Sequence, residues 1–113
     1  MKYLIKVEQK KPCGKHLGDY SQTVEGEPVI IPGFEQIKLF AHKITEEDFD
    51  CWGISEITTG LAIVHYDDCI PTKDMAIVYA TLKMAKKGLQ YVLDTIKTCQ
   101  PVESFPLFKE KKK

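Results

Sequence analysis

The sequence contains no arginine and no asparagine, so all sixteen of its basic residues are lysine. Arginine is the usual bidentate reader of guanine and of phosphate, and lysine cannot reproduce its planar fork of donors. Sixteen acidic residues match the lysines, and the formal net charge at pH 7 is zero. A neutral chain without arginine is therefore a poor candidate for sequence-specific DNA binding.

The chain also lacks a long apolar run and an N-terminal secretory pattern. No run approaches the roughly 18 apolar residues of a membrane span. The first residues lead directly into a strand pattern, with no apolar core or cleavage site of the signal-peptide kind. We therefore expect a soluble, cytoplasmic protein whose thiols are reduced. The four cysteines are Cys13, Cys51, Cys69 and Cys99.

A helical pattern in the second half of the chain is the strongest local signal. Between Met75 and Ile96, apolar residues recur at spacings of three and four, which predicts one buried stripe. Thr72 is the expected N-cap, and Gly88 is expected to break or kink the pattern, with a second short helix over 89–98. The predicted stripe comprises Met75, Val78, Tyr79, Leu82, Ala85, Leu89, Val92, Leu93 and Ile96.

Strand patterns precede this helix. Alternating apolar residues predict strands over 3–8 and 36–44. A hairpin is expected within 51–66, with Gly60 at a turn position that needs positive φ. Residues 9–27 have no sustained period and are interpreted as a long loop.

The predicted fold is α+β, with an antiparallel sheet of three to five strands and one long C-terminal helix, kinked or interrupted at Gly88, on one face. At 113 residues the chain is long enough for one core. Residues 1–108 are expected to form a single globular domain and residues 109–113 a lysine-rich tail. Because the helical stripe is expected to face the sheet, Leu82→Asp should unfold the domain. The strand residues expected beneath the helix are Trp52, Ile54, Leu61 and Ile63.

Two pairs of residues have metal-ligand spacing. Cys13-x-x-His16 and His65-x-x-x-Cys69 would together supply the Cys2His2 set of a tetrahedral zinc site. The pairs lie far apart in the sequence, however, and neither is a paired-cysteine knuckle. We therefore predict no metal and no cofactor.

A cysteine nucleophile with a histidine base is a second candidate chemistry. Cys51 or Cys69 would take the first role and His42 or His65 the second. No residues beside either cysteine resemble a nucleophile motif, so we predict that the protein is not an enzyme. The alternative, a small enzyme or ligand-binding protein, would build its site from His42, His65, Cys51 and Asp67.

One stretch resembles known proteins. The pattern Trp52-x-Ile-x-Glu-x-Thr-Thr-Gly-Leu-x-Ile, followed by Pro-Thr-Lys-Asp-x-Ala-Ile and a helix to Gly88, is similar to a hairpin and helix found in many small, mostly uncharacterised proteins of bacteriophages and mobile elements. It covers residues 49–98, less than half of the chain. The resemblance implies an accessory protein, of the kind that blocks a host defence enzyme as anti-CRISPR proteins do. The resemblance implies no catalytic residue in this sequence.

We therefore predict a non-enzymatic protein that binds a protein partner, in its sharpest form an inhibitor of a host defence nuclease or effector. Acidic turns and a C-terminal apolar tail are the expected contacts. Solvated carboxylates can imitate nucleic-acid phosphates towards a basic partner, and exposed apolar residues mark partner surfaces. The expected contact residues are Glu46, Glu47, Asp48, Asp50, Asp67, Asp68, Phe105, Leu107 and Phe108.

A nucleic-acid-binding module is the main alternative. A lysine-lined sheet, with Tyr20 and Trp52 beside the lysines, would bind phosphates with an affinity that falls as salt rises. The expected contact lysines are Lys10, Lys11, Lys15, Lys38 and Lys43. The sequence leaves open whether edge strands pair in a homodimer.

Overall fold

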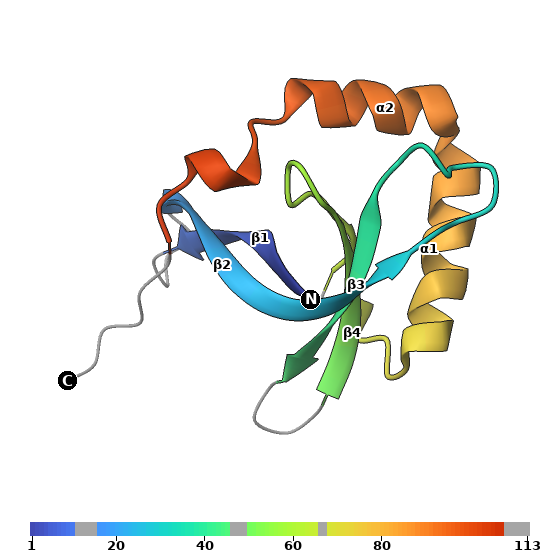
Figure 1. The fold of residues 1–113 in the computed structure, drawn as a ribbon, viewed down its shortest axis with the longest axis horizontal. Helices are drawn as coiled ribbons and strands as arrows, with labels where there is room; N and C mark the ends of the chain where they lie inside the picture. Colours follow the sequence, from blue (N-terminus) through green and yellow to red (C-terminus); the bar gives the residue numbers. More distant parts are fainter. Residues whose placement is uncertain (11–15, 46–49, 66–67, 108–113) are drawn as a thin grey trace.

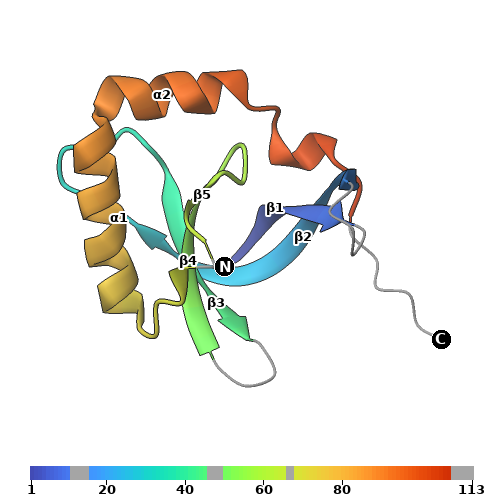
Figure 2. The ribbon, with the colours of Figure 1, turned by 180° about the vertical axis from the view of Figure 1, so that it is seen from behind.

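Five antiparallel strands form one sheet in the computed structural model, which describes residues 1–10, 16–45, 50–65 and 68–107. The strands lie side by side in chain order, so each pairs with its neighbour in the sequence. Figures 1 and 2 show that the sheet is strongly curled, with the β1–β2 ribbon bending away from α1. The strands are β1 (Lys2–Lys10), β2 (His16–Val29), β3 (Leu39–Thr45), β4 (Asp50–Glu56) and β5 (Ala62–Val64).

The prediction of a loop over residues 9–27 is wrong, because most of this segment is the long strand β2. It pairs with β1 in a register that runs from Lys2 opposite Glu25 to Lys10 opposite His16. Gln22, Thr23 and Glu25 are all exposed, so β2 faces solvent on both sides over this stretch, whereas Ser21 and Val29 are buried. A stretch without a buried face has no apolar alternation for a sequence pattern to detect.

Two helices follow the sheet, α1 (Lys73–Lys87) and α2 (Leu89–Thr98), and a short 3-10 helix η2 spans Val102–Ser104. The prediction of one long helix is wrong, whereas the expected break at Gly88 and the second short helix are confirmed. The N-cap is also confirmed, because the Thr72 hydroxyl accepts from the Met75 N–H at 3.2 Å. Within the described residues, neither helix combines the length and hydrophobicity needed to cross a bilayer.

The break between α1 and α2 is set by the backbone of Gly88, which has φ +89° and ψ 151°. This region of conformational space is essentially restricted to glycine. Gly88→Ala is therefore expected to lower the free energy of unfolding by about 1 to 3 kcal/mol, measured by urea denaturation. A variant with equal stability and more helical circular dichroism would show instead that the two helices can fuse.

The buried face of α1 is not the one expected from the sequence. Ala76, Ala80 and Met84 are buried, with exposed fractions of at most 1%, and they pack on the sheet. Leu82 and Val78, assigned to the buried stripe, are 64% and 60% exposed. The two alanines present little side chain, so the helix can pack closely on the strands while its larger apolar residues face outward. The expectation that Leu82→Asp unfolds the protein is therefore withdrawn.

The main core lies between α1, the sheet and the connection from β2 to β3. Of the strand residues expected beneath the helix, Ile54 and Ile63 are buried, while Trp52 and Leu61 are half-buried and pack against the same cluster. The buried members of this core are Val29, Ile31, Phe34, Ile37, Leu39, Ala41, Ile54, Ile63, Val64, Ala76, Ala80, Met84 and Val92.

Candidate binding surfaces

An apolar strip lies along the side of α1 that faces away from the sheet. Met75, Val78 and Leu82 follow one another at spacings of three and four, so they share one side of the helix. Their exposed fractions are 53%, 60% and 64%. Figures 1 and 2 show α1 at the flank of the molecule, with the connection from β2 to β3 passing beside its C-terminal half. We call these three residues the α1 outer face.

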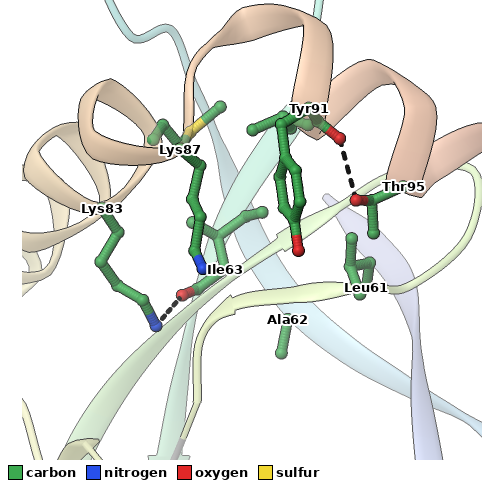
Figure 3. A pocket seen from close by; sticks show the side chains of 9 residues that line it. Leu61, Ala62, Ile63, Lys83, Lys87, Tyr91 and Thr95 are labelled. Carbon is green, nitrogen blue, oxygen red and sulfur yellow. Dashed lines mark hydrogen bonds between the residues drawn. The ribbon is translucent and has the colours of Figure 1, made fainter.

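A hollow of about 160 Å³ lies on another side of α1, where the helix meets α2 and the edge strand β5 (Figure 3). Its apolar lining comes from β5 and the residue before it, from α1 and from α2, namely Leu61, Ala62, Ile63, Met84 and Val92. Two lysines from α1 and Tyr91 from α2 add polar atoms. The lining residues are Leu61, Ala62, Ile63, Lys83, Met84, Lys87, Tyr91, Val92 and Thr95.

Lys83 and Lys87, one turn apart on α1, have different partners. The Lys83 ammonium donates to the Ile63 carbonyl oxygen at 2.8 Å and lies 3.7 Å from the Asp68 carboxylate. The Lys87 ammonium lies 5.2 Å from the centre of the Tyr91 ring, a cation–π distance. Across the described part of the chain, Lys87 forms no ion pair. Among the residues that the structure describes, no carboxylate therefore balances the positive charge of Lys87 at the hollow.

The predicted acidic contacts do not form one patch among the described residues. Asp50 is exposed at the start of β4, where its carboxylate lies 3.2 Å from the Lys43 ammonium. Asp68 is half-buried; its carboxylate accepts from the His65 N–H at 2.9 Å and from the Tyr79 hydroxyl at 3.4 Å. Asp68 therefore stabilises the connection between β5 and α1. The other predicted acidic contacts, Glu46, Glu47, Asp48 and Asp67, lie outside the described residues.

The described part of the predicted apolar tail, residues 105–107, is hydrogen-bonded to β2. The Ser21 N–H donates to the Pro106 carbonyl oxygen at 2.9 Å, and its hydroxyl donates to the Phe105 carbonyl oxygen at 3.1 Å. Phe105 is half-buried, whereas Leu107 is 56% exposed. Phe108 lies outside the described residues. Leu107 thus remains a candidate contact, whereas the Phe105 side chain is partly buried within the protein.

The structure describes the side chains of only two of the five lysines that were expected to contact nucleic acid. Lys38 is exposed just before β3, and Lys43 is paired with Asp50. Lys10 ends β1, but its side chain is outside the described set, as are the whole of Lys11 and Lys15. The predicted lysine-lined surface therefore stays a prediction.

Two residues of the enzyme alternative, His42 and Cys51, are enclosed by the fold, and Asp67 lies outside the described residues. His42 and Cys51 lie on adjacent strands and are 4% and 1% exposed. The His42 Nε2 lies 3.3 Å from the Ser55 hydroxyl. The described residues include no group of three or more histidine, cysteine and acidic side chains placed to hold a metal. Cys13, one of the four proposed zinc ligands, is outside them.

Burial makes His42 a source of acid sensitivity. Desolvation lowers the pKa of its imidazole from 6.5 to about 4. Between pH 6.5 and pH 4, the His42 imidazole therefore binds a proton in the unfolded chain but not in the folded protein. The free energy of unfolding is thus highest above pH 6.5 and decreases as the pH falls. We expect a loss of about 3 kcal/mol between pH 7 and pH 4, measured by urea denaturation at each pH. His42→Leu should remove this part of the pH dependence, and an unchanged profile would contradict the assignment.

Comparison with protein-family models, with curated proteins and with solved structures finds no match for this chain. The resemblance to bacteriophage and mobile-element proteins therefore stays a prediction. Function has to be argued from the geometry of these surfaces.

Sequence reasoning missed both surfaces. It assigned the residues of the α1 outer face to the core, because large apolar residues at helical spacing usually face the sheet. The pair Lys83 and Lys87 was visible as two basic residues four apart. Their position beside Ile63 depends on how α1 packs against β5, and no local pattern encodes that contact.

Proposed function

We propose that this protein is a non-enzymatic protein-binding module and that the α1 outer face is its principal contact. The observation that carries the proposal is the exposure of Met75, Val78 and Leu82, each more than half accessible to solvent. Contiguous exposed apolar residues on a protein surface commonly mark an interaction site.

The geometry of this face suits recognition by a groove. Three apolar residues at positions i, i+3 and i+7 of one helix are the anchors that a hydrophobic groove accepts in helix-in-groove complexes. Asp74 and Lys86 are exposed near the two ends of the strip and would lie at the rim of such an interface, where polar groups are usual. The partner is therefore expected to present an apolar groove about two helical turns long.

An inhibitor of a host defence nuclease or effector is the specific form of this proposal. It is supported by the resemblance of residues 49–98 to bacteriophage and mobile-element proteins, and by the small size of the chain. Among the described members of the contact set expected from the sequence, Asp50 and Leu107 are the exposed ones. They would act as contacts separate from the α1 outer face, since the C-terminal segment lies across the molecule from α1 (Figure 1).

The test is a pull-down with tagged protein from a lysate of a low-GC bacterium, treated with nuclease and analysed by mass spectrometry. Wild-type protein is expected to retain one protein at equal stoichiometry. Leu82→Asp should abolish that capture, because it places a charge within the apolar contact at its most exposed residue. Gln100→Asp is the matched control, since it adds the same charge at an exposed position outside both helices.

Three outcomes would count against the proposal. Capture by Leu82→Asp at the wild-type level would exclude the α1 outer face. Capture that disappears with nuclease would favour the nucleic-acid alternative instead. Failure to retain any protein would leave the exposed strip without the role assigned to it.

A further inference from the structure

The hollow between β5, α1 and α2 has the size of one ring. Its volume is about 160 Å³, close to that of an enclosed apolar cavity of about 150 Å³ that holds a benzene-sized molecule, although this hollow is open to solvent. Figure 3 shows the Tyr91 ring projecting from α2 towards Leu61 and Ile63. Val92, buried at 6% exposure, completes the apolar side. A group larger than one ring would extend into solvent.

The polar atoms of the hollow are gathered on the α1 side. Figure 3 shows the side chains of Lys83 and Lys87 extending in the same direction, both towards Ile63. The Lys83 ammonium is engaged by the Ile63 carbonyl and by Asp68. The Lys87 ammonium has the Tyr91 ring beside it and no ion pair among the described residues. One unbalanced cation thus stands beside an apolar recess.

We propose that this hollow binds a small organic carboxylate that carries one ring-sized apolar group. The ring would occupy the space lined by Leu61, Ile63 and Val92, and the carboxylate would pair with the Lys87 ammonium. An inorganic anion would leave the apolar lining unfilled, and a neutral ring would leave the charge unpaired. This inference is independent of the proposed protein contact, because the hollow and the α1 outer face lie on different sides of α1.

The test is a titration of the whole protein with phenylacetate, followed by chemical-shift changes in a two-dimensional NMR spectrum. Saturable shifts are expected at Ile63, Val92 and Thr95, with a dissociation constant on the order of 1 mM for so small a ligand. The affinity should fall when sodium chloride is raised, since the ion pair is partly exposed. Acetate and benzyl alcohol are the ligand controls, because each supplies only one of the two features.

Two lysine variants separate a specific ion pair from general surface charge. Lys87→Gln is expected to weaken phenylacetate binding by about 3- to 5-fold, the range of a partly exposed ion pair, and to leave benzyl alcohol unaffected. Lys86→Gln removes the same charge at the adjacent exposed residue, which does not line the hollow, and should leave phenylacetate binding unchanged. A third variant, Thr95→Phe, should abolish binding by filling the hollow.

Several results would overturn the proposal. One is the absence of saturable shifts with phenylacetate at 20-fold the expected dissociation constant. Others are equal losses in Lys86→Gln and Lys87→Gln, or benzyl alcohol binding as tightly as phenylacetate. Because both lysine substitutions are at the surface and keep a good helix-forming residue, they test the site even where Thr95→Phe does not fold.

Discussion

Ala80→Asp is expected to unfold the protein, whereas Leu82→Asp is expected to leave it folded. Ala80 is completely buried against the sheet, and a carboxylate there would lose its hydration without gaining a partner. The cost of burying such a group is several kcal/mol, which is comparable to the whole stability of a small domain. Leu82 is 64% exposed, so its replacement should change the free energy of unfolding by about 0.5 kcal/mol or less.

The measurement is circular dichroism with urea denaturation of both variants beside the wild-type protein. The pair is internally controlled, because both changes introduce the same charge on the same helix two residues apart. A cooperatively folded Ala80→Asp protein would show that α1 does not pack on the sheet through its alanine face. An unfolded Leu82→Asp protein would restore the orientation expected from the sequence.

Glu56→Gln is expected to destabilise the protein by about 2 kcal/mol, since glutamine keeps one acceptor oxygen while a backbone N–H of the turn loses the other. The Glu56 carboxylate accepts from the Thr58 N–H at 2.7 Å and from the Thr59 N–H at 3.0 Å. It also accepts from both threonine hydroxyls, at 2.7 and 2.8 Å. In glutamine an NH2 group replaces one of the two carboxylate oxygens. This NH2 group is itself a hydrogen-bond donor, so it would face an N–H donor of the turn.

The loss should extend beyond the turn that follows β4. The Val102 N–H donates to the Thr58 carbonyl oxygen at 2.9 Å, and Gly60 packs closely against Lys6 of β1. The turn therefore joins β4 to η2 and to the first strand. Glu103→Gln is the matched control, because Glu103 is exposed and its replacement should be nearly neutral in urea denaturation. Equal effects of the two substitutions would show that the buried carboxyl group does not organise the turn.

Local chemistry was enough to predict the starts and ends of several elements. Thr72 begins α1 because its hydroxyl caps the first turn, and Gly88 ends it because its backbone takes a conformation that other residues avoid. Gly60, with φ +70°, occupies the turn before β5 as expected. These features depend on one residue and its immediate neighbours, so the sequence alone determined them, together with the α+β class and an antiparallel sheet.

Tertiary structure decided which face of α1 is buried. The helix has apolar residues on two sides, and the choice between them depends on how closely it packs against the strands. Ala76 and Ala80 allow a close contact that Met75 and Leu82 would prevent. The sequence pattern weighted hydrophobicity and took no account of side-chain size, and it therefore selected the wrong side.

Only the tertiary structure also revealed β2 and the hollow. β2 is specified by pairing with β1, and residues 22–25 face solvent on both sides, so its polar residues carried no strand pattern. The hollow requires β5, α1 and α2 to meet, which brings Ile63 beside Lys83 and Tyr91 beside Lys87. Cross-strand pairing and contacts between distant elements are not encoded in any short stretch of sequence, because each depends on the position of a partner elsewhere in the chain.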